Sequence, residues 1–479
     1  MSHKIVYNGN IIELSYSEIE MCLKVILFLI LTTQLKPLSS SDVSSSCSNK
    51  DRTFILLDTA MSFLSKAKEI VPRCFYDAHQ SKKIGTSSSY LDTTKNLISA
   101  AKNVLTSRSR DSKFKVVCYF SSLAFYRTGD AKFNFSAFPP RLCTHAIYVF
   151  AKMVNNRIES CRPDLDLPGD IDGYKKFNDL KRKNSKLRTL ISVGGCPTGS
   201  SSFSPMAADP LARSVFAESV LVFIQQHGFD GLDLNWIYSG EDKGKEEYKR
   251  NFVILLQTLK EVLKPKGYLL TSSVSPTKYI IDTTYDIPAI SKELDFINLL
   301  SFHFRKSWQP MTGLNSPLYA NEELSEEAKE LTVDFVVDYW LKGGAPKQKL
   351  VMGMSLMGRT FTLANSTENG VLAPAIGPGN RGRLKADGLL AFFDICENLT
   401  KDGWASVWEP DSQTPYAYKG DQWVSYDDQR SLHAKINYLV KKGLAGGLVW
   451  SIDVDDFKGT CYGKKYYLLR SISSKLIAG

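Results

Sequence analysis

Residues 229–236 read FDGLDLNW, and the rest of the chain can be interpreted outward from this stretch. Apolar residues on both faces predict a buried strand, although polar side chains recur at Asp230, Asp233 and Asn235. Side chains two positions apart on a strand point to the same face. Asp233, Asn235 and Ile237 therefore share a face, and any chemistry at the end of this strand depends on those three residues.

The same pattern recurs through the last three quarters of the chain. Apolar, β-rich runs are each followed by a loop and a helical stretch; they are FKVVCYF, THAIYVF, LRTLISVGG, FDGLDLNW, YLLTSSVS, LDFINLL, KLVMGM and AGGLVW. The clearest helices are expected at Pro210–His227, Glu246–Leu263, Ser325–Lys342 and Ser431–Lys442. Strands that are apolar on both faces and alternate with helices favour an α/β fold, a (β/α)8 TIM barrel, over residues 112–479.

One interval departs from this spacing. The chain between KLVMGM and AGGLVW is far longer than a single crossover needs, and its second half is rich in Trp and Tyr. We therefore expect an inserted α+β subdomain at residues 359–425, between the seventh and eighth barrel strands.

The N-terminal part of the chain does not follow the barrel pattern. An apolar run from Val25 to Leu31 follows Met21 and is too short to span a bilayer comfortably, which suits the core of a signal peptide. Residues 1–41 form an N-terminal segment in which either translation starts at Met21, with the segment up to about Ser41 leaving as a cleaved signal, or the run is an uncleaved signal anchor. We favour cleavage and expect a secreted, extracellular protein. Residues 42–111 contain two helical patterns and are expected to form a helical extension or linker.

Charge and cysteine content bear on the partners and the compartment. The formal net charge is +10, but Lys and Arg are scattered, and the densest run, Lys181–Lys183, is typical of a solvated helix face. We expect no nucleic-acid binding. Of nine cysteines, Cys22 leaves with the signal, and the even number that remains suits disulfides. Glycosylation sequons begin at Asn134, Asn365 and Asn398.

Taken together, the motifs resemble the chitinases and chitinase-like proteins of glycoside hydrolase family 18. The resemblance covers about residues 113–470 in the family's order. It is carried by CYF, LCTHAIYVFA, YKKFNDLKRKNSKLRTLISVGG, FDGLDLNW, LDFINLLSFHFRKSW, TGLNSPLY, LVMGMSLMGRTFTLA, PYAYKGDQWVSYDD and GGLVWSIDVDDF. It does not reach the N-terminal part of the chain.

The resemblance implies that catalysis has been lost. Active members carry Asp-x-x-Asp-x-Asp-x-Glu on the fourth strand, where this chain has Asp230, Asp233, Asn235 and Ile237. In the family the Glu is the general acid, and the Asp before it orients the substrate acetamide that acts as nucleophile. Isoleucine has no proton to give, and an amide cannot match a carboxylate beside a developing cation. We expect a protein that resembles a chitinase but is not an enzyme.

Further family positions are also changed. The sixth-strand motif Met-x-Tyr-Asp is matched by Leu300, Phe302 and His303, so the hydroxyl that holds the acetamide is absent. Met357 replaces a Tyr of the seventh-strand motif. Glu241 lies four residues past Ile237, in a Gly-rich polar loop that suggests no fixed geometry for an alternative acid.

Some candidate sugar-binding residues are retained. Trp450 matches the Trp that forms the floor of the family's central subsite, although a large core residue is the alternative interpretation. The other candidates that match family positions in or near the groove are Tyr119, Asp233, Trp308 and Arg359. Against binding, Cys196 and Leu123 stand where the family has Trp, and Phe302 and His303 replace a Tyr-Asp pair that contacts sugar.

The resemblance also pairs Cys118 with Cys143 and Cys396 with Cys461. For the remaining cysteines, Cys161 and Cys196 follow neighbouring strands, and Cys47 and Cys74 flank the first helix of the extension. We predict these two further pairs, although spacing alone cannot fix connectivity. In the alternative, Cys196 is a free, buried residue that fills the space of the absent Trp.

Two classes of function remain open. The first is a secreted, lectin-like protein that binds chitin, chito-oligosaccharides or another glycan without cleaving it. The second is an extracellular growth-factor-like or immune signalling protein that acts through protein partners without sugar. Because the six His show no metal-ligand spacing, we expect no metal and no cofactor. We expect a monomer.

Overall fold

The computed structural model describes residues 2–7, 10–15, 114–195, 202–237, 246–322 and 324–477. The chain divides into two compact units, Met1–Asp111 and Ser112–Gly479. In the first unit, β1 (Ser2–Tyr7) and β2 (Asn10–Ser15) form an antiparallel hairpin. The signal segment, the helical extension, Cys47, Cys74, Cys196 and Glu241 all lie outside the described residues.

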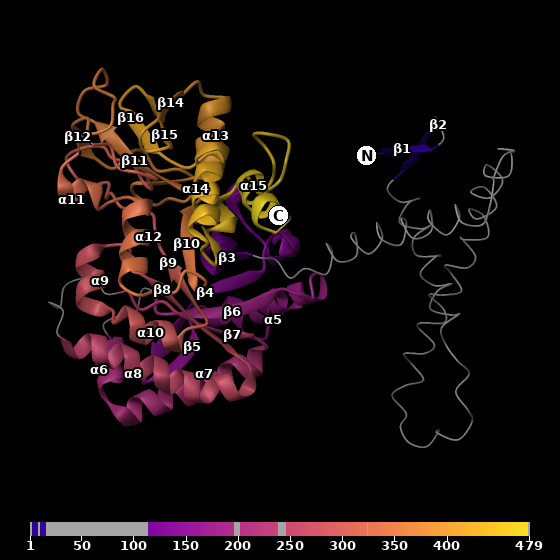
Figure 1. The fold of residues 1–479 in the computed structure, drawn as a ribbon, viewed down its shortest axis with the longest axis vertical. Helices are drawn as coiled ribbons and strands as arrows, with labels where there is room; N and C mark the ends of the chain where they lie inside the picture. The colour runs from indigo at the N-terminus through magenta and orange to yellow at the C-terminus, as the bar shows by residue number, and fades with distance from the viewer. Residues whose placement is uncertain are drawn as a thin grey trace, which may run out of the picture. The chain divides into compact units, whose positions relative to one another are not determined.

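The second unit is a closed parallel barrel (Figure 1). Its strands follow one another in the order β3, β4, β6, β7, β8, β9, β10 and β17, and β17 pairs with β3 to close the ring. Their bounds are Lys115–Ser121, His145–Val154, Arg188–Val193, Gly231–Leu234, Leu269–Val274, Phe296–Leu299, Leu350–Ser355 and Gly446–Trp450. A short strand, β5 (Arg157–Ser160), pairs antiparallel with the end of β4. The predicted (β/α)8 fold is confirmed.

The alternation of side chains along each strand builds two apolar layers. On β3, Val117 and Tyr119 belong to the cluster inside the barrel, whereas Val116, Cys118 and Phe120 belong to the cluster between strands and helices. Because both faces of the strand are covered, the run is apolar at nearly every position.

Helices surround the strands and return the chain to the start of the next strand (Figure 1). They are α4 (Pro163–Asp166), α5 (Gly173–Asn178), α6 (Phe203–Ala208), α7 (Pro210–His227), α8 (Glu246–Leu263), α9 (Lys278–Thr284), α10 (Ile287–Glu293), α11 (Glu326–Lys329), α12 (Val333–Lys342), α14 (Gln429–Lys442) and α15 (Tyr467–Leu476). The bounds of α7 follow from its sequence: the Asp209 side chain accepts from the backbone N–H of Leu211 and Ala212, and Gly228 ends the helix at φ +74°.

The single helix expected over Ser325–Lys342 is wrong. Thr332 adopts extended backbone angles, and its side chain accepts a hydrogen bond from the N–H of Phe335. It therefore caps a new helix, and the segment divides into the single turn α11 and the longer α12.

Between β10 and β17 the chain forms a separate antiparallel sheet with one helix (Figure 1). The elements are β11 (Met357–Leu363), β12 (Ala375–Gly377), β13 (Leu389–Ala391), α13 (Phe392–Thr400), β14 (Ala405–Glu409), β15 (Thr414–Lys419) and β16 (Gln422–Ser425). Its core packs Phe361, Tyr416 and Trp423 together. We call this part the inserted subdomain.

Disulfides join Cys118 to Cys143 and Cys396 to Cys461, the two pairs that the family resemblance implies. The second pair ties α13 of the inserted subdomain to the chain after β17. Cys161 is also disulfide-bonded, and its partner lies outside the described residues. Among the described helices, none has both the length and the apolar character needed to cross a membrane.

Candidate functional site

Asp233 lies at the centre of a polar network inside the barrel. Its side chain is fully buried, and its oxygens accept hydrogen bonds from five side chains on four other strands of the barrel. The donors are Tyr119 (3.1 Å), Ser192 (2.8 Å), Thr271 (2.7 Å), Ser273 (3.1 Å) and Asn298 (3.1 Å). Burial raises the pKa of Asp233, and the hydrogen bonds oppose that rise.

The other positions of the fourth-strand motif lie at different heights along β7. Asp230 precedes the strand, where its carboxylate accepts from the backbone N–H of Thr189 at 2.8 Å and from Lys181 at 3.1 Å. It belongs to the amino end of the barrel and joins β6 to β7. Asn235 and Ile237 follow the last strand residue, Leu234, at the carboxyl end, where active sites of such barrels lie.

The position expected to carry the proton donor holds no ionisable group. Ile237 is partly buried, and Asn235 is 7% exposed, with its backbone N–H donating to the carbonyl oxygen of Val193 at 2.8 Å. A general acid must lie within hydrogen-bond reach of the leaving oxygen. Neither side chain can supply that proton.

Trp450, at the end of β17, stays partly exposed and is surrounded by rings. Its ring centroid lies 5.3 Å from that of Tyr119, 6.3 Å from that of Phe150 and 6.4 Å from that of Phe302. The Tyr119 hydroxyl also donates a hydrogen bond to Asp233, which links the ring cluster to the polar network. An aromatic face held in this way can stack on a sugar ring.

Phe302 and His303 follow β9 at the same end of the barrel. Phe302 packs against Gly353, where a Cβ would lie 2.8 Å from the Phe302 ring. His303 has φ +60°, and its Nε2 lies 3.3 Å from Oγ of Ser355. Burial, with the positive charges of Arg359 and Lys306, holds the pKa of His303 well below its usual value. The imidazole is therefore neutral at neutral pH.

The remaining candidates differ in exposure. Arg359, on β11, is only 6% exposed, whereas Trp308 is 74% exposed. Leu123, at a position where the family has Trp, is 49% exposed. Tyr119 thus contacts both Asp233 and Trp450, and no contact of Trp308 with these three residues is found among the described residues.

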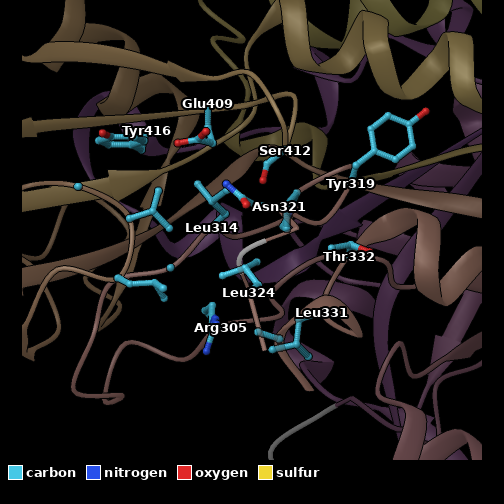
Figure 2. A pocket seen from close by; sticks show the side chains of 16 residues that line it. Arg305, Leu314, Tyr319, Asn321, Leu324, Leu331, Thr332, Glu409, Ser412 and Tyr416 are labelled. Carbon is cyan, nitrogen blue, oxygen red and sulfur yellow. The ribbon is translucent and has the colours of Figure 1, made fainter. Parts of the chain in front are cut away.

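A separate cavity of about 390 Å³ lies between the segment that precedes α12, which includes α11, and the inserted subdomain. Figure 2 shows Arg305 and Glu409 on opposite sides of it, with Leu314 and Leu324 between them. None of the candidate sugar-binding residues lines this cavity. It is therefore distinct from the ring cluster around Trp450.

No resident metal is suggested by the described residues. Cys396, Asp456 and Cys461 bring two sulfurs and a carboxylate close together, but the sulfurs form a disulfide. Without a thiolate, the group lacks the ligands that soft-metal sites use.

Sequence reasoning singled out Tyr119 but not the other four donors around Asp233. Ser192, Thr271, Ser273 and Asn298 each stand within an apolar run, at a position whose side chain points into the barrel. The alternation of side chains along a strand could have indicated two of them. Thr271 and Ser273 in LLTSSV lie two positions apart, so they share the face that meets Asp233 across the sheet.

Comparisons with known proteins agree with this arrangement. The model of the family "Glycosyl hydrolases family 18" matches residues 115–455. Chitotriosidase-1 of Mus musculus is 39% identical over 375 residues, which are 76% of this chain and 78% of that protein.

Two solved structures illustrate the range within this fold. The Ostrinia furnacalis group IV chitinase has a TM-score of 0.73 and 34% identity, covering 76% of this chain and 99% of that one. Human YKL-39, described as a pseudo-chitinase with retained chitooligosaccharide binding properties, has a TM-score of 0.70 and 37% identity over 76% of this chain and 99% of that one. The chain belongs to glycosyl hydrolase family 18.

Proposed function

We propose that this protein is a secreted, non-catalytic chitinase-like protein that binds chitin-type oligosaccharides or a related glycan at the carboxyl end of its barrel. One observation carries the proposal. The proton-donor position holds Ile237, whereas Trp450 remains partly exposed within a cluster of aromatic rings. The catalytic group is replaced while a platform for a sugar ring is kept.

Similar proteins support sugar binding without catalysis. The family contains chitinases as well as YKL-39, which is described as a pseudo-chitinase that retains chitooligosaccharide binding. We extend binding without catalysis to this chain because Trp450 and Asp233 keep the matching positions. Phe302 and His303 alter the same surface, so the sugar preference is expected to differ.

Secretion is supported by the cysteines and the sequons. Two disulfides and a bonded Cys161 fit an oxidising compartment. Two of the three sequon asparagines, Asn134 and Asn365, are exposed and therefore accessible for glycosylation.

Titration of the purified protein with chitotetraose tests the binding, by calorimetry and by intrinsic Trp fluorescence. We expect saturable binding that Trp450→Ala weakens at least about tenfold, because a stacked ring contributes on the order of 1 kcal/mol or more. Trp408→Ala is the matched control, since Trp408 is a partly buried Trp on the inserted subdomain that packs under Arg430. Its binding should equal that of the unsubstituted protein.

Two results would contradict the proposal in different ways. Saturable binding that survives Trp450→Ala would place the sugar elsewhere on the molecule. No binding to chito-oligomers or to any member of a glycan array would remove the lectin function and leave signalling through protein partners as the remaining hypothesis.

A further inference from the structure

The guanidinium of Arg359 is buried without a counter-ion among the described residues. The side chain is 6% exposed, and its Nε has no hydrogen-bond acceptor. Its Nη1 has one long contact, 3.5 Å to the carbonyl oxygen of Gly388. Burial lowers the pKa of Arg359 to about 10, so the group stays charged at neutral pH. Buried charges in proteins are normally paired, and an arginine offers five N–H donors to its partner.

Two other basic side chains interact electrostatically with this charge. After burial, the positive charge of Arg359 further lowers the pKa of both His303 and Lys306. His303 stands where the family motif has Asp, so a negative charge has been exchanged for an imidazole beside a retained guanidinium. Within the described part of the chain, no carboxylate offsets the two remaining positive charges. We call Arg359, His303 and Lys306 the basic cluster.

The basic cluster borders the Trp450 platform. Nε2 of His303 contacts Oγ of Ser355, and Ser355 pairs with Trp450 across β10 and β17. Phe302, next to His303 in the chain, stacks on Trp450 with 6.4 Å between ring centroids. A ring that lies on Trp450 would therefore have His303, the member of the basic cluster that these contacts link to Trp450, on its Ser355 side.

The position of the basic cluster is fixed by one backbone carbonyl. The oxygen of Gly388 accepts a hydrogen bond from Oγ of Ser307 at 3.0 Å and the longer contact from Arg359. This holds the loop after β9 against the inserted subdomain. The shared carbonyl limits the movement of Arg359 relative to the loop that carries His303 and Lys306.

We propose that the preferred ligand is an acidic glycan, in which a carboxylate or sulfate on a sugar ring is bound by Arg359, His303 and Lys306 while that ring or its neighbour lies against Trp450. This inference rests on the proposed sugar-binding function and names the class of sugar. Guanidinium groups bind carboxylate and sulfate-like oxygens through paired N–H donors. A neutral chito-oligosaccharide would leave the buried charge unpaired and is therefore the weaker ligand.

Calorimetry with three tetrasaccharides of one backbone tests the proposal: chitotetraose, 6-O-sulfated chitotetraose, and chitotetraose oxidised to the carboxylate at C6. At about 50 mM salt, where screening is modest, the protein should bind at least one charged tetramer at least about tenfold more tightly than chitotetraose. Comparison of the sulfated and oxidised tetramers distinguishes sulfate from carboxylate as the recognised group.

Substitutions at His303 provide the sharpest control. His303→Asp supplies an internal counter-ion to Arg359 and should remove the preference for charged tetramers over chitotetraose. His303→Asn introduces a side chain of nearly the same size as Asp but without its charge, and this variant should retain the preference for charged tetramers. Both Asp and Asn tolerate the positive φ of His303 better than most residues. Arg359→Met should also remove the preference, whereas Arg381→Gln, at an exposed arginine paired with Asp387, should not.

The possible outcomes separate the inference from the proposed function. Equal affinity for charged and neutral tetramers, or an unchanged preference in His303→Asp, overturns the acidic-glycan proposal and leaves sugar binding intact. A preference lost equally in Arg381→Gln would show only attraction to the net positive surface, and would also overturn it. Failure of all three tetramers to bind removes both proposals. If Arg359→Met does not fold, the pair at His303 still decides the question.

Discussion

At the residue scale, the chemistry of this barrel depends on side chains that follow the last residue of β7. Asp233 keeps its carboxylate, but all five of its donors are side chains within the protein, and the group is fully buried. In that setting the carboxylate organises the interior of the barrel. Ile237, two strand positions further out than Asn235, is apolar where the family mechanism needs a proton.

The first prediction is that the protein does not hydrolyse chitin, chito-oligomers or aryl chitobiosides. General-acid catalysis alone contributes about 10²–10⁴-fold, and Ile237 cannot provide it. Release of the aryl group, followed over hours, should not exceed the rate without protein. Turnover that disappears when a single barrel carboxylate is substituted would contradict this expectation.

The second prediction concerns partial restoration. Ile237→Glu with Asn235→Asp should recover little activity, because Phe302 lacks the hydroxyl that the family uses to hold the acetamide. Adding Phe302→Tyr and His303→Asp should raise the rate above that of the double variant by at least about tenfold, the low end for a positioned catalytic hydrogen bond. Rates of the double variant that already match family chitinases would show that the sixth-strand changes are unimportant.

At the scale of secondary-structure elements, the sequence predicted the strands better than the breaks in helices. The run KLVMGM predicted β10 because both faces of that strand are buried, so every position is apolar or small. The break at Thr332 was missed because the helical period continues across it, and only the cap hydrogen bond to Phe335 shows where α12 begins. The polar network around Asp233 was missed for a similar reason, since its donors depend on which strands become neighbours.

The third prediction concerns Lys435 on α14, a fully buried lysine. Its Nζ lies 2.6 Å from each carboxylate oxygen of Asp427 and 3.0 Å from Oγ of Ser316, so it joins α14 and the residues just before it to the loop after β9. Lys435→Met should lower the free energy of unfolding by about 3–5 kcal/mol, because Asp427 is left as an uncompensated buried charge.

Urea denaturation followed by circular dichroism measures this loss. Lys175→Met is the control, since Lys175 is exposed and pairs with Asp179 along a short helix. Exposed pairs of this kind contribute little, so its unfolding midpoint should match that of the unsubstituted protein. Equal midpoints for both variants would contradict a structural role for the buried pair.

At the scale of the whole molecule, the barrel closes entirely within residues 115–450. The order of eight apolar runs with intervening helices was enough to predict this closure, because a parallel sheet needs crossovers and has few alternatives of this size. The preference for a ligand could not be predicted in the same way. The ligand preference depends on the proximity of His303 and Arg359, which lie on segments before and after β10. No local sequence pattern indicates that these two residues are neighbours in the fold.

The last prediction is that the fragment 112–479 folds and binds sugar without residues 1–111. Its described strands, β1 and β2, pair only with each other and not with the closed sheet, and it forms a separate compact unit. The fragment should unfold within about 2 °C of the full chain, a shift equivalent to about 1.5 kcal/mol for a protein of this size. Its affinity for chitotetraose should be the same.

This prediction depends on where Cys161 finds its partner. If Cys161 pairs with Cys196, both sulfurs lie in the fragment, and non-reducing peptide mapping of the full chain will show that link beside Cys47–Cys74. A Cys47–Cys161 link would instead join the two units covalently. The fragment would then carry a free thiol at Cys161 and lose the stabilisation of about 2–4 kcal/mol that a disulfide typically gives. A thermal midpoint well below that of the full chain, together with that link, would show that the N-terminal unit is part of the stable fold.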